Sequence, residues 1–579
     1  MGIQKYVLGL SLSAGGILFS GDGFGQAIPE QDLNIIKRQQ NEIQRHNETQ
    51  RRLIELKNKA GGKSTPLLVP QPEQPDLPHG TTCFQADKII LNGVTLLSSG
   101  EQADLLEPYV GNCITLKQVD DLLRAITNLY NKKGYVTSRG FVPSQDISDG
   151  SLELNIVEGF VQGYELHDDK SRKAWRLQTA FPFTVEHPLN LRDIEQGLDQ
   201  INRLKSNNAT MTLEPGSSQG ATLVKIENKN SKSWHVSTGY NNSGQTATGI
   251  QQWTGRAEID DLLGINDFMS FSWSKDTKAG NPQQSRSLSG FWSIPFGYLT
   301  LSGSHSFYTN ASRINATTAS YINEGYSRTQ KLELDGVVYR DKNSKANLTG
   351  FLRQHTAASF INENKLDSSS YRLTSIGLST GYETRLWNGI FSTDFTFEKG
   401  IRALGAKEDI GITDPATPRA QFHKAELALN YYKPFEIAQQ NLTYVGSGRA
   451  QWSPMTLYSP DQFTIGGESS VRGYKESTLG GDQGAYIQNT LSWHLAQTGL
   501  EPVDKLFGTF SPFVGYDIGA LENDAKDQTE KGVLSGYAVG LKTSGGYLNL
   551  SATYARPIRT PAHLQERHHE LYLSLTLSF

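Results

Sequence analysis

The sequence is poor in cysteine, balanced in charge and, beyond its N-terminus, free of long apolar runs. Its 579 residues contain 2 Cys, so the chain can form at most one internal disulfide. Lys+Arg total 55 against 59 Asp+Glu, a net charge of -4, and this lack of bulk basicity argues against nucleic acid as a partner. A membrane-spanning helix needs about 18 or more consecutive apolar residues. No such run follows the N-terminal region, so we expect no spanning helix after it.

Sequence motifs for catalysis, metal binding or nucleotide binding are also missing. His568, His569 and Glu570 lack the spacing of a metalloprotease helix, and no Ser/His/Asp arrangement is legible. The run Gly-Lys-Ser at 62–64 faintly resembles a phosphate loop, but the first glycine of that motif would fall at Lys57. We therefore predict no enzyme activity, no cofactor and no metal site.

Alternation of apolar and polar residues is present instead, most clearly at the C-terminus. Residues 571–579 alternate without a break and end on the aromatic Phe579. This is the period of a strand with one face in oil and one in water, and it is typical of a bacterial outer-membrane β-barrel. The mean hydropathy of -0.46 does not contradict a barrel, because only alternate residues of each strand meet lipid. The 56 Gly and 10% aromatic residues suit tight turns and interfacial belts.

The N-terminus has the pattern of a secretory signal. Lys5 precedes an apolar stretch from Tyr6 to Phe19, and small residues lead to Ala27, after which we expect cleavage. Residues 1–27 are thus predicted to be a signal peptide. Export would place Cys83 and Cys113 in an oxidising compartment, where two such thiols more often pair than stay free.

Residues 28–59 are predicted to form a polar helix, and residues 60–81 a Pro-rich linker. Pro29 suits a first helical turn, and acidic residues near it complement the helix dipole. Basic and acidic residues alternate along the helix, so we expect it to lie in a hydrated environment with charged groups nearby. By pattern alone it is a solvated helix or a weak coiled coil. The linker should be extended and semi-rigid.

Two small α+β units follow, at 82–159 and 160–230. In the first, Thr115 and Gln118 form a capping-box pair that opens a helix, and Gly134 ends it. One face of this helix is apolar: Val119, Leu122, Leu123, Ile126 and Tyr130. A single strand is expected before it, from Phe84 to Leu91, and two more after it. The second unit repeats this plan, and each is large enough to bury a core of its own.

From 231 to 579 the pattern changes to β-strands separated by Gly, Asn, Asp, Ser and Pro turns. We count about sixteen strands, and their spacing suits tilted membrane strands joined by alternating short and long turns. The polar faces hold mostly Ser, Thr, Asn and Gly, which fits a water-filled lumen better than the charged outer face of a soluble sandwich. The predicted fold is a sixteen-stranded antiparallel transmembrane barrel.

One long connection, at 457–483, contains the run Val471-Arg472-Gly473-Tyr474. With the predicted signal, helix, linker, two modules and barrel, this run resembles the TpsB transporters of two-partner secretion, relatives of the barrel-assembly protein BamA. It matches the Val-Arg-Gly-Tyr/Phe signature of the sixth extracellular loop, which in that family folds back into the lumen. The resemblance covers essentially the whole mature chain and implies that the two units are polypeptide-transport-associated (POTRA) domains.

The resemblance also implies a partner for the loop arginine, an acidic residue in a Gly-or-Phe-x-Asp pattern two strands onward. Gly515 and Asp517 match that pattern. Independently, strand alternation places Asp517 on the wetter face, so its carboxylate should point into the lumen, where Arg472 could reach it. A carboxylate that faced lipid would be costly.

By the same resemblance, the helix at 28–59 would plug the lumen, and a Cys83–Cys113 disulfide would stabilise the first module by about 3 to 4 kcal/mol. The family relation implies a monomer in the outer membrane, with its modules in the periplasm, that exports one large secreted exoprotein. That partner would be a β-helical haemolysin, adhesin or contact-dependent-inhibition toxin. Periplasmic chaperones and the barrel-assembly machinery would insert the barrel into lipid, with Phe579 as the C-terminal signal. The alternatives are a BamA-like assembly factor, against which two modules and a plug argue, and a solute porin, which needs no modules.

Overall fold

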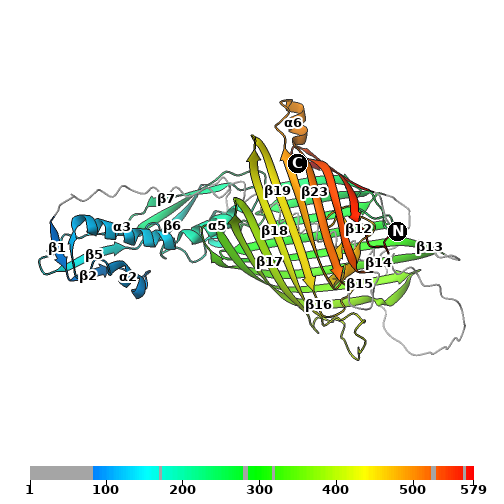
Figure 1. Cartoon of the computed structure of the whole chain (residues 1–579), viewed down its shortest axis with the longest axis horizontal. Helices are drawn as coiled ribbons and strands as arrows, with labels where there is room; N and C mark the ends of the chain where they lie inside the picture. Colours follow the sequence, from blue (N-terminus) through cyan, green and yellow to red (C-terminus); the bar gives the residue numbers. More distant parts are fainter. Residues whose placement is uncertain (1–81, 168–172, 278–283, 316–319, 523–529, 565–568) are drawn as a thin grey trace.

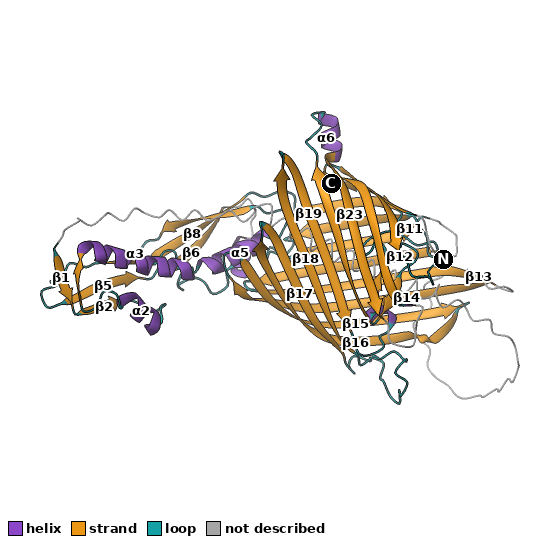
Figure 2. Ribbon diagram, in the orientation of Figure 1, coloured by secondary structure: helices purple, strands orange, loops and turns teal. Residues whose placement is uncertain are grey.

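The computed structural model describes residues 82–167, 173–277, 284–315, 320–522, 530–564 and 569–579 (Figure 1). The predicted signal peptide, plug helix and linker, at 1–81, lie outside the described residues. Two small units project from one end of a large barrel (Figures 1 and 2). In the described ranges, no helix is long and apolar enough to cross a membrane.

The first unit combines two short sheets with two helices. Strands β1 and β3 pair antiparallel, while β5 pairs parallel with β2 and antiparallel with β4. The disulfide joins Cys83 of β1 to Cys113 of β3, with 5.4 Å between the Cα atoms. The elements are β1 (Cys83–Ala86), β2 (Lys88–Asn92), α2 (Ser99–Leu106), β3 (Asn112–Thr115), α3 (Leu116–Lys133), β4 (Arg139–Phe141) and β5 (Ser151–Val157).

Helix α3 forms for the reasons visible in its sequence. The Thr115 side chain accepts from the backbone N–H of Gln118, and the Gln118 side chain accepts from the backbone N–H of Thr115. Gly134 ends the helix at φ +97°, a conformation that favours glycine. The predicted apolar face is buried against β2 and β5, so this prediction is confirmed. The single strand predicted from Phe84 to Leu91 is in fact two, β1 and β2, which pair with different partners.

Glu158 ties the end of the first unit to its interior. Its carboxylate accepts from the backbone N–H groups of Thr95 and Leu96 and from the Tyr130 hydroxyl at 2.7 Å. Partial burial acts to raise the pKa of Glu158, but these hydrogen bonds outweigh it and hold the pKa below its usual value. Burial and the same carboxylate raise the pKa of Tyr130. The ionised form of Glu158 therefore stabilises this unit.

The second unit is a three-stranded sheet in the order β6-β8-β7, with two helices. β6 runs parallel to β8, and β7 runs antiparallel to it. The free side of β6 is partly covered, because Val161 exchanges backbone hydrogen bonds with residues 186 and 187. The elements are β6 (Phe160–His167), α4 (Lys173–Ala180), α5 (Leu191–Asn202), β7 (Ala209–Pro215) and β8 (Ala221–Asn228).

The rest of the chain forms a closed antiparallel barrel, and the sixteen predicted strands are confirmed. The final strand pairs with the first over five residue pairs, from Ser574↔Asn241 to Ser578↔Ser237. The strands are β9 (Trp234–Asn241), β10 (Gln252–Asp260), β11 (Phe268–Asp276), β12 (Gln284–Phe296), β13 (Leu299–Asn315), β14 (Ser320–Arg340), β15 (Ser344–Ile361), β16 (Asn364–Leu386), β17 (Gly389–Gly400), β18 (His423–Ile437), β19 (Gln440–Trp452), β22 (Gln483–His494), β23 (Gly508–Glu522), β24 (Gly532–Gly545), β25 (Leu548–Arg559) and β26 (Glu570–Ser578). A short helix, α6 (Glu501–Phe507), lies in the turn between β22 and β23.

The second unit is bound firmly to the barrel end. Arg176 of α4 forms an ion pair with Asp261 of the β10–β11 turn at 3.1 Å, and both side chains are almost fully buried. Gln196 and Gln200 of α5 both donate to the carbonyl of Gly297, in the β12–β13 turn. Separating a buried ion pair leaves charges buried without a partner, which costs free energy. These contacts therefore hold the unit in one orientation on the barrel.

Candidate protein-conducting lumen

The long connection between β19 and β22, residues 457–483, crosses the interior of the barrel; we call it the inward loop. It contains a 3-10 turn, η1 (Ser459–Asp461), and a small hairpin of β20 (Phe463–Ile465) and β21 (Leu479–Gly481). Its apolar side chains pack on inward-facing residues of β22, β23 and β24: Phe463, Ile465, Val471, Tyr474 and Leu479 against Tyr486, Leu521 and Leu534. The loop thus has a core of its own within the lumen.

Arg472 reaches Asp517 on β23 by three hydrogen bonds. Its Nε donates to Oδ2 and its Nη2 to Oδ1, each at 2.7 Å, and its backbone N–H donates to Oδ2 at 3.0 Å. Nη2 also donates to the carbonyl of Asn489 on β22 at 2.9 Å. Arg472 is 5% exposed and Asp517 is 0% exposed. Such a bidentate ion pair fixes both the position and the orientation of the guanidinium group.

Alternation along β23 explains why Asp517 is available to the loop. Val514 and Tyr516 are about half exposed on the outer face of the barrel, while Asp517 lies on the inner face. Gly515 shares that inner face, and a Cβ there would lie 2.2 Å from Nη2 of Arg472 and 2.6 Å from the Asn489 carbonyl. The Gly-x-Asp pattern therefore combines a carboxylate with the space that the guanidinium needs.

The neighbouring motif residues also make specific contacts. Val471 is fully buried in the loop core. Gly473 has φ +101°, and a Cβ there would meet the backbone of Arg556 and Pro557. The Tyr474 hydroxyl lies 2.9 Å from the Ser535 carbonyl and 2.6 Å from that of Arg559, at the ends of β24 and β25. All four motif residues thus contact the barrel wall or the loop core.

A second set of ionic contacts, which sequence reasoning missed, holds the other limb of the inward loop. Asp461 is fully buried and forms ion pairs with Arg353 on β15 and, at 3.6 Å, Lys424 on β18. Arg353 also pairs with Glu398 on β17 at 2.6 Å, and Lys424 pairs with Glu426 at 2.7 Å. We call Arg353, Glu398, Lys424, Glu426 and Asp461 the second ionic cluster. The sequence feature that could have indicated this cluster is the presence of acidic and basic residues on the inward face of neighbouring strands. Their contact with residue 461, however, depends on how the loop crosses the lumen.

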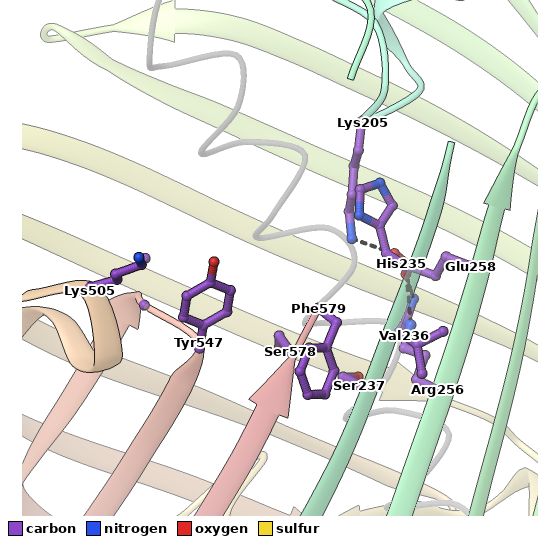
Figure 3. Close-up of a pocket in the computed structure, with 12 residues that line it drawn as sticks. Lys205, His235, Val236, Ser237, Arg256, Glu258, Lys505, Tyr547, Ser578 and Phe579 are labelled. Carbon is purple, nitrogen blue, oxygen red and sulfur yellow. Dashed lines mark hydrogen bonds and ion pairs between the residues drawn. The ribbon is translucent and has the colours of Figure 1, made fainter. Parts of the chain in front are cut away.

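A cavity of about 700 Å³ lies at the end of the barrel that faces the second unit (Figure 3). Lys205, from the second unit, lines it together with Arg256 and Glu258 of β10, and the Lys205 ammonium lies 2.5 Å from the Glu258 carboxylate. Phe579 also lines the cavity, and its backbone N–H donates to the Val236 carbonyl at 2.9 Å. The cavity therefore lies beside the seam where the last strand meets the first.

Polar and charged side chains line the interior of the barrel and contact the inward loop. Across the described part of the chain, no group of three or more His, Cys, Asp or Glu side chains is placed to hold a metal ion. The charged groups of the lumen instead join the inward loop to the wall at two separated places.

Comparison with protein families agrees with this architecture. The family described as haemolysin secretion/activation protein ShlB/FhaC/HecB matches residues 220–543. A ShlB-type POTRA domain matches residues 84–159, and a further POTRA domain matches residues 160–215. The two N-terminal units are thus POTRA domains, as the sequence predicted; we refer to them as POTRA 1 and POTRA 2.

Individual relatives match over most of their length. The outer membrane transporter CdiB of Dickeya dadantii is 32% identical over 549 residues, which cover 94% of each chain. The hemolysin transporter protein ShlB of Serratia marcescens is 30% identical over 463 residues, 78% of each chain. The solved structure of CdiB from Escherichia coli superposes with a TM-score of 0.85 at 29% identity, covering 96% of this chain and 100% of that one.

Proposed function

This chain belongs to the haemolysin secretion/activation protein family of outer-membrane transporters, and from that membership we propose that it exports one large β-helical exoprotein. Members of this family are transporters, not enzymes, and the chain lies in the bacterial outer membrane. The partner we propose is a contact-dependent-inhibition toxin, a haemolysin or an adhesin. The observation that carries this proposal is the polar lumen crossed by a loop that two sets of ionic contacts hold to the wall.

The POTRA domains would receive the unfolded partner by strand addition. This mode uses backbone hydrogen bonds, so it tolerates many sequences. Strand β7 forms an edge of the POTRA 2 sheet, and β6, the opposite edge, is partly covered by residues 186 and 187. The Asn202 side chain occupies the free side of β7 at Ala209, the first residue of that strand, so an incoming strand would add to β7 beyond this residue.

From POTRA 2 the partner would enter the barrel at its periplasmic end and pass as a hairpin through the lumen. The predicted helix at 28–59 would have to leave the lumen first. Folding of the partner outside the cell would supply the drive, so no ATP is required. The contact between Arg472 and Asp517 would hold the inward loop and keep the wall in a conducting geometry.

The test is a comparison of the secreted and surface proteomes by quantitative mass spectrometry. Strains would lack this chain or carry it as wild type, Arg472→Ala or Arg286→Ala, the last a matched change at an exposed arginine of β12. We expect one very large exported protein to be lost on deletion and restored by wild type and Arg286→Ala, but not by Arg472→Ala, whose barrel still inserts.

Other outcomes would contradict the proposal. A fall in many outer-membrane barrels on deletion would indicate an assembly factor instead. An unchanged proteome would point to a solute porin. Normal export by Arg472→Ala would refute only the proposed role of the Arg472–Asp517 contact and would leave the export function standing.

A further inference from the structure

POTRA 2 presents exposed apolar side chains beside the barrel rim. Trp175 of α4 is 63% exposed, and Phe183, which follows that helix, is 83% exposed. Beside them, Leu262 and Leu263 of the β10–β11 turn and Phe296 at the end of β12 are about half exposed. We call Trp175, Phe183, Leu262, Leu263 and Phe296 the rim patch.

The contacts of Thr179 fix where this patch lies. Within α4, Thr179 lies one turn after Trp175, so these two residues share a face of the helix. Its hydroxyl donates to the carbonyl of Ile265, in the same turn as the two leucines, and its own carbonyl accepts from the N–H of Gly297, next to Phe296. The Thr179 contacts therefore place the Trp175 face of α4 at the periplasmic rim of the barrel, and the ring contact with Phe296 places Phe183 there as well.

The patch continues the lipid-facing surface of the barrel. Along β12, Phe296 shares its face with Leu288, Trp292 and Ile294, while Ser293 lies on the opposite, inward face. The Phe183 ring packs edge-on against Phe296, with 5.9 Å between ring centroids. An aromatic side chain of POTRA 2 is thus joined to the apolar band of the barrel.

The lumen side of POTRA 2 is a different surface. Arg203 donates to the inward-facing Ser293, and Gln200 lies 3.5 Å from the Thr300 hydroxyl, so polar contacts from the end of α5 face the lumen. A polypeptide on its way into the barrel would meet these polar groups. The rim patch, outside the ring of strands, would meet the membrane.

We propose that the rim patch enters the headgroup region of the periplasmic leaflet, so that phospholipid is a direct partner of POTRA 2. Tryptophan is enriched at membrane interfaces, because its ring is apolar while its N–H can bond to water or headgroups, and the phenylalanine rings add apolar surface beside it. Phe183 also has φ +60°, which is uncommon for a bulky residue, and its side chain is largely exposed. Lipid contact would hold POTRA 2 against the membrane, whatever exoprotein is exported.

The experiment uses tryptophan fluorescence of the full chain in phospholipid nanodiscs. The signal of Trp175 is the difference between wild type and Trp175→Phe. Quenching of this Trp175 signal is measured with two agents: iodide, which quenches from water, and phospholipid spin-labelled near the top of the acyl chain, which quenches from the membrane. In the Trp175→Phe background, Leu288→Trp reports the lipid-facing band of β12 outside the rim patch, and Phe141→Trp reports a water-exposed position on β4 of POTRA 1.

We expect spin-labelled lipid to quench Trp175 as it quenches the Leu288→Trp reporter, and iodide to quench Trp175 several-fold less than the Phe141→Trp reporter. Heat-modifiable mobility on gels checks that each barrel is folded. Equal iodide quenching of Trp175 and the Phe141→Trp reporter, with no quenching by lipid, would overturn the proposal. Protection of Trp175 only after the exoprotein is added would also overturn it, since the patch would then bind protein.

Discussion

Replacing Gly515 with alanine should release the inward loop, although neither member of the Arg472–Asp517 pair is changed. The new Cβ would lie 2.2 Å from Nη2 of Arg472. Because carbon and nitrogen in contact need more than 3 Å, the guanidinium must withdraw by about 1 Å, which takes its 2.7 Å bonds to Asp517 out of hydrogen-bonding range. Both groups would stay buried with their bonds broken.

The expected cost follows from burial of the pair. Removing one partner of a buried ion pair costs about 3 to 5 kcal/mol. Gly515→Ala keeps both charges, which can bind other groups, so we expect a cost of about 3 kcal/mol. A loss of about 3 kcal/mol makes local opening roughly a hundredfold more frequent. Lys475, three residues beyond Arg472 and 7% exposed, then becomes available to trypsin.

The assay is the rate of trypsin cleavage after Lys475 in the intact protein, followed by mass spectrometry. Where opening is fast relative to cleavage, this rate follows the population of the open loop. The matched control is Gly350→Ala on β15, where a Cβ would have nothing within 4 Å. Gly515→Ala should be cut about a hundredfold faster than Gly350→Ala. Equal rates would refute the account of why this glycine precedes the aspartate.

Three further predictions concern the other contacts described above. Asp461→Asn keeps the shape of the side chain but removes the charge that pairs with Arg353, so the part of the inward loop around residue 461 should open about tenfold or more as often. Faster hydrogen exchange of peptides from this part of the loop would show the opening. Unchanged exchange would contradict the role of the second ionic cluster in holding the loop. The pKa of Glu158 is lowered on folding, so its stabilisation of POTRA 1 is present above the unfolded value of about 4.3 and is lost as pH falls through the lower folded value. Protection of α3 from exchange should fall in that acidic window, and Glu158→Gln should lack the step. Reduction of the Cys83–Cys113 bond should lower POTRA 1 stability by about 3 to 4 kcal/mol, seen as faster exchange in α3 with no change in the barrel; an unchanged POTRA 1 would show that the bond is dispensable.

Much of the architecture could be predicted because it depends on local patterns. Strand alternation with turn residues predicted sixteen strands, since each barrel strand must present one face to lipid and one to water. The capping residues Thr115 and Gly134 predicted both ends of α3, because they satisfy backbone groups within one turn. Alternation along β23 likewise predicted the inward direction of Asp517.

Contacts between distant segments could not be predicted in this way. Arg353 and Asp461 are 108 residues apart, and nothing local to either residue selects the other. The ion pair of Arg176 with Asp261 depends on how POTRA 2 docks on the barrel, which no periodicity describes. Helix α2 was missed although Ser98 and Glu101 form a capping box, because none of its residues is buried and its apolar face is weak.

The central claim is that an exoprotein passes through this barrel, and site-specific photo-crosslinking in exporting cells tests it most directly. Leu332 and Glu333 are neighbours on β14, but Leu332 lies on the outer face and Glu333 on the inner one. A photoreactive amino acid would replace each in turn. The account predicts that the reagent at 333 captures the exoprotein in transit and that the reagent at 332 captures none. Capture at neither position while export continues, or equal capture at both, would contradict passage through the lumen.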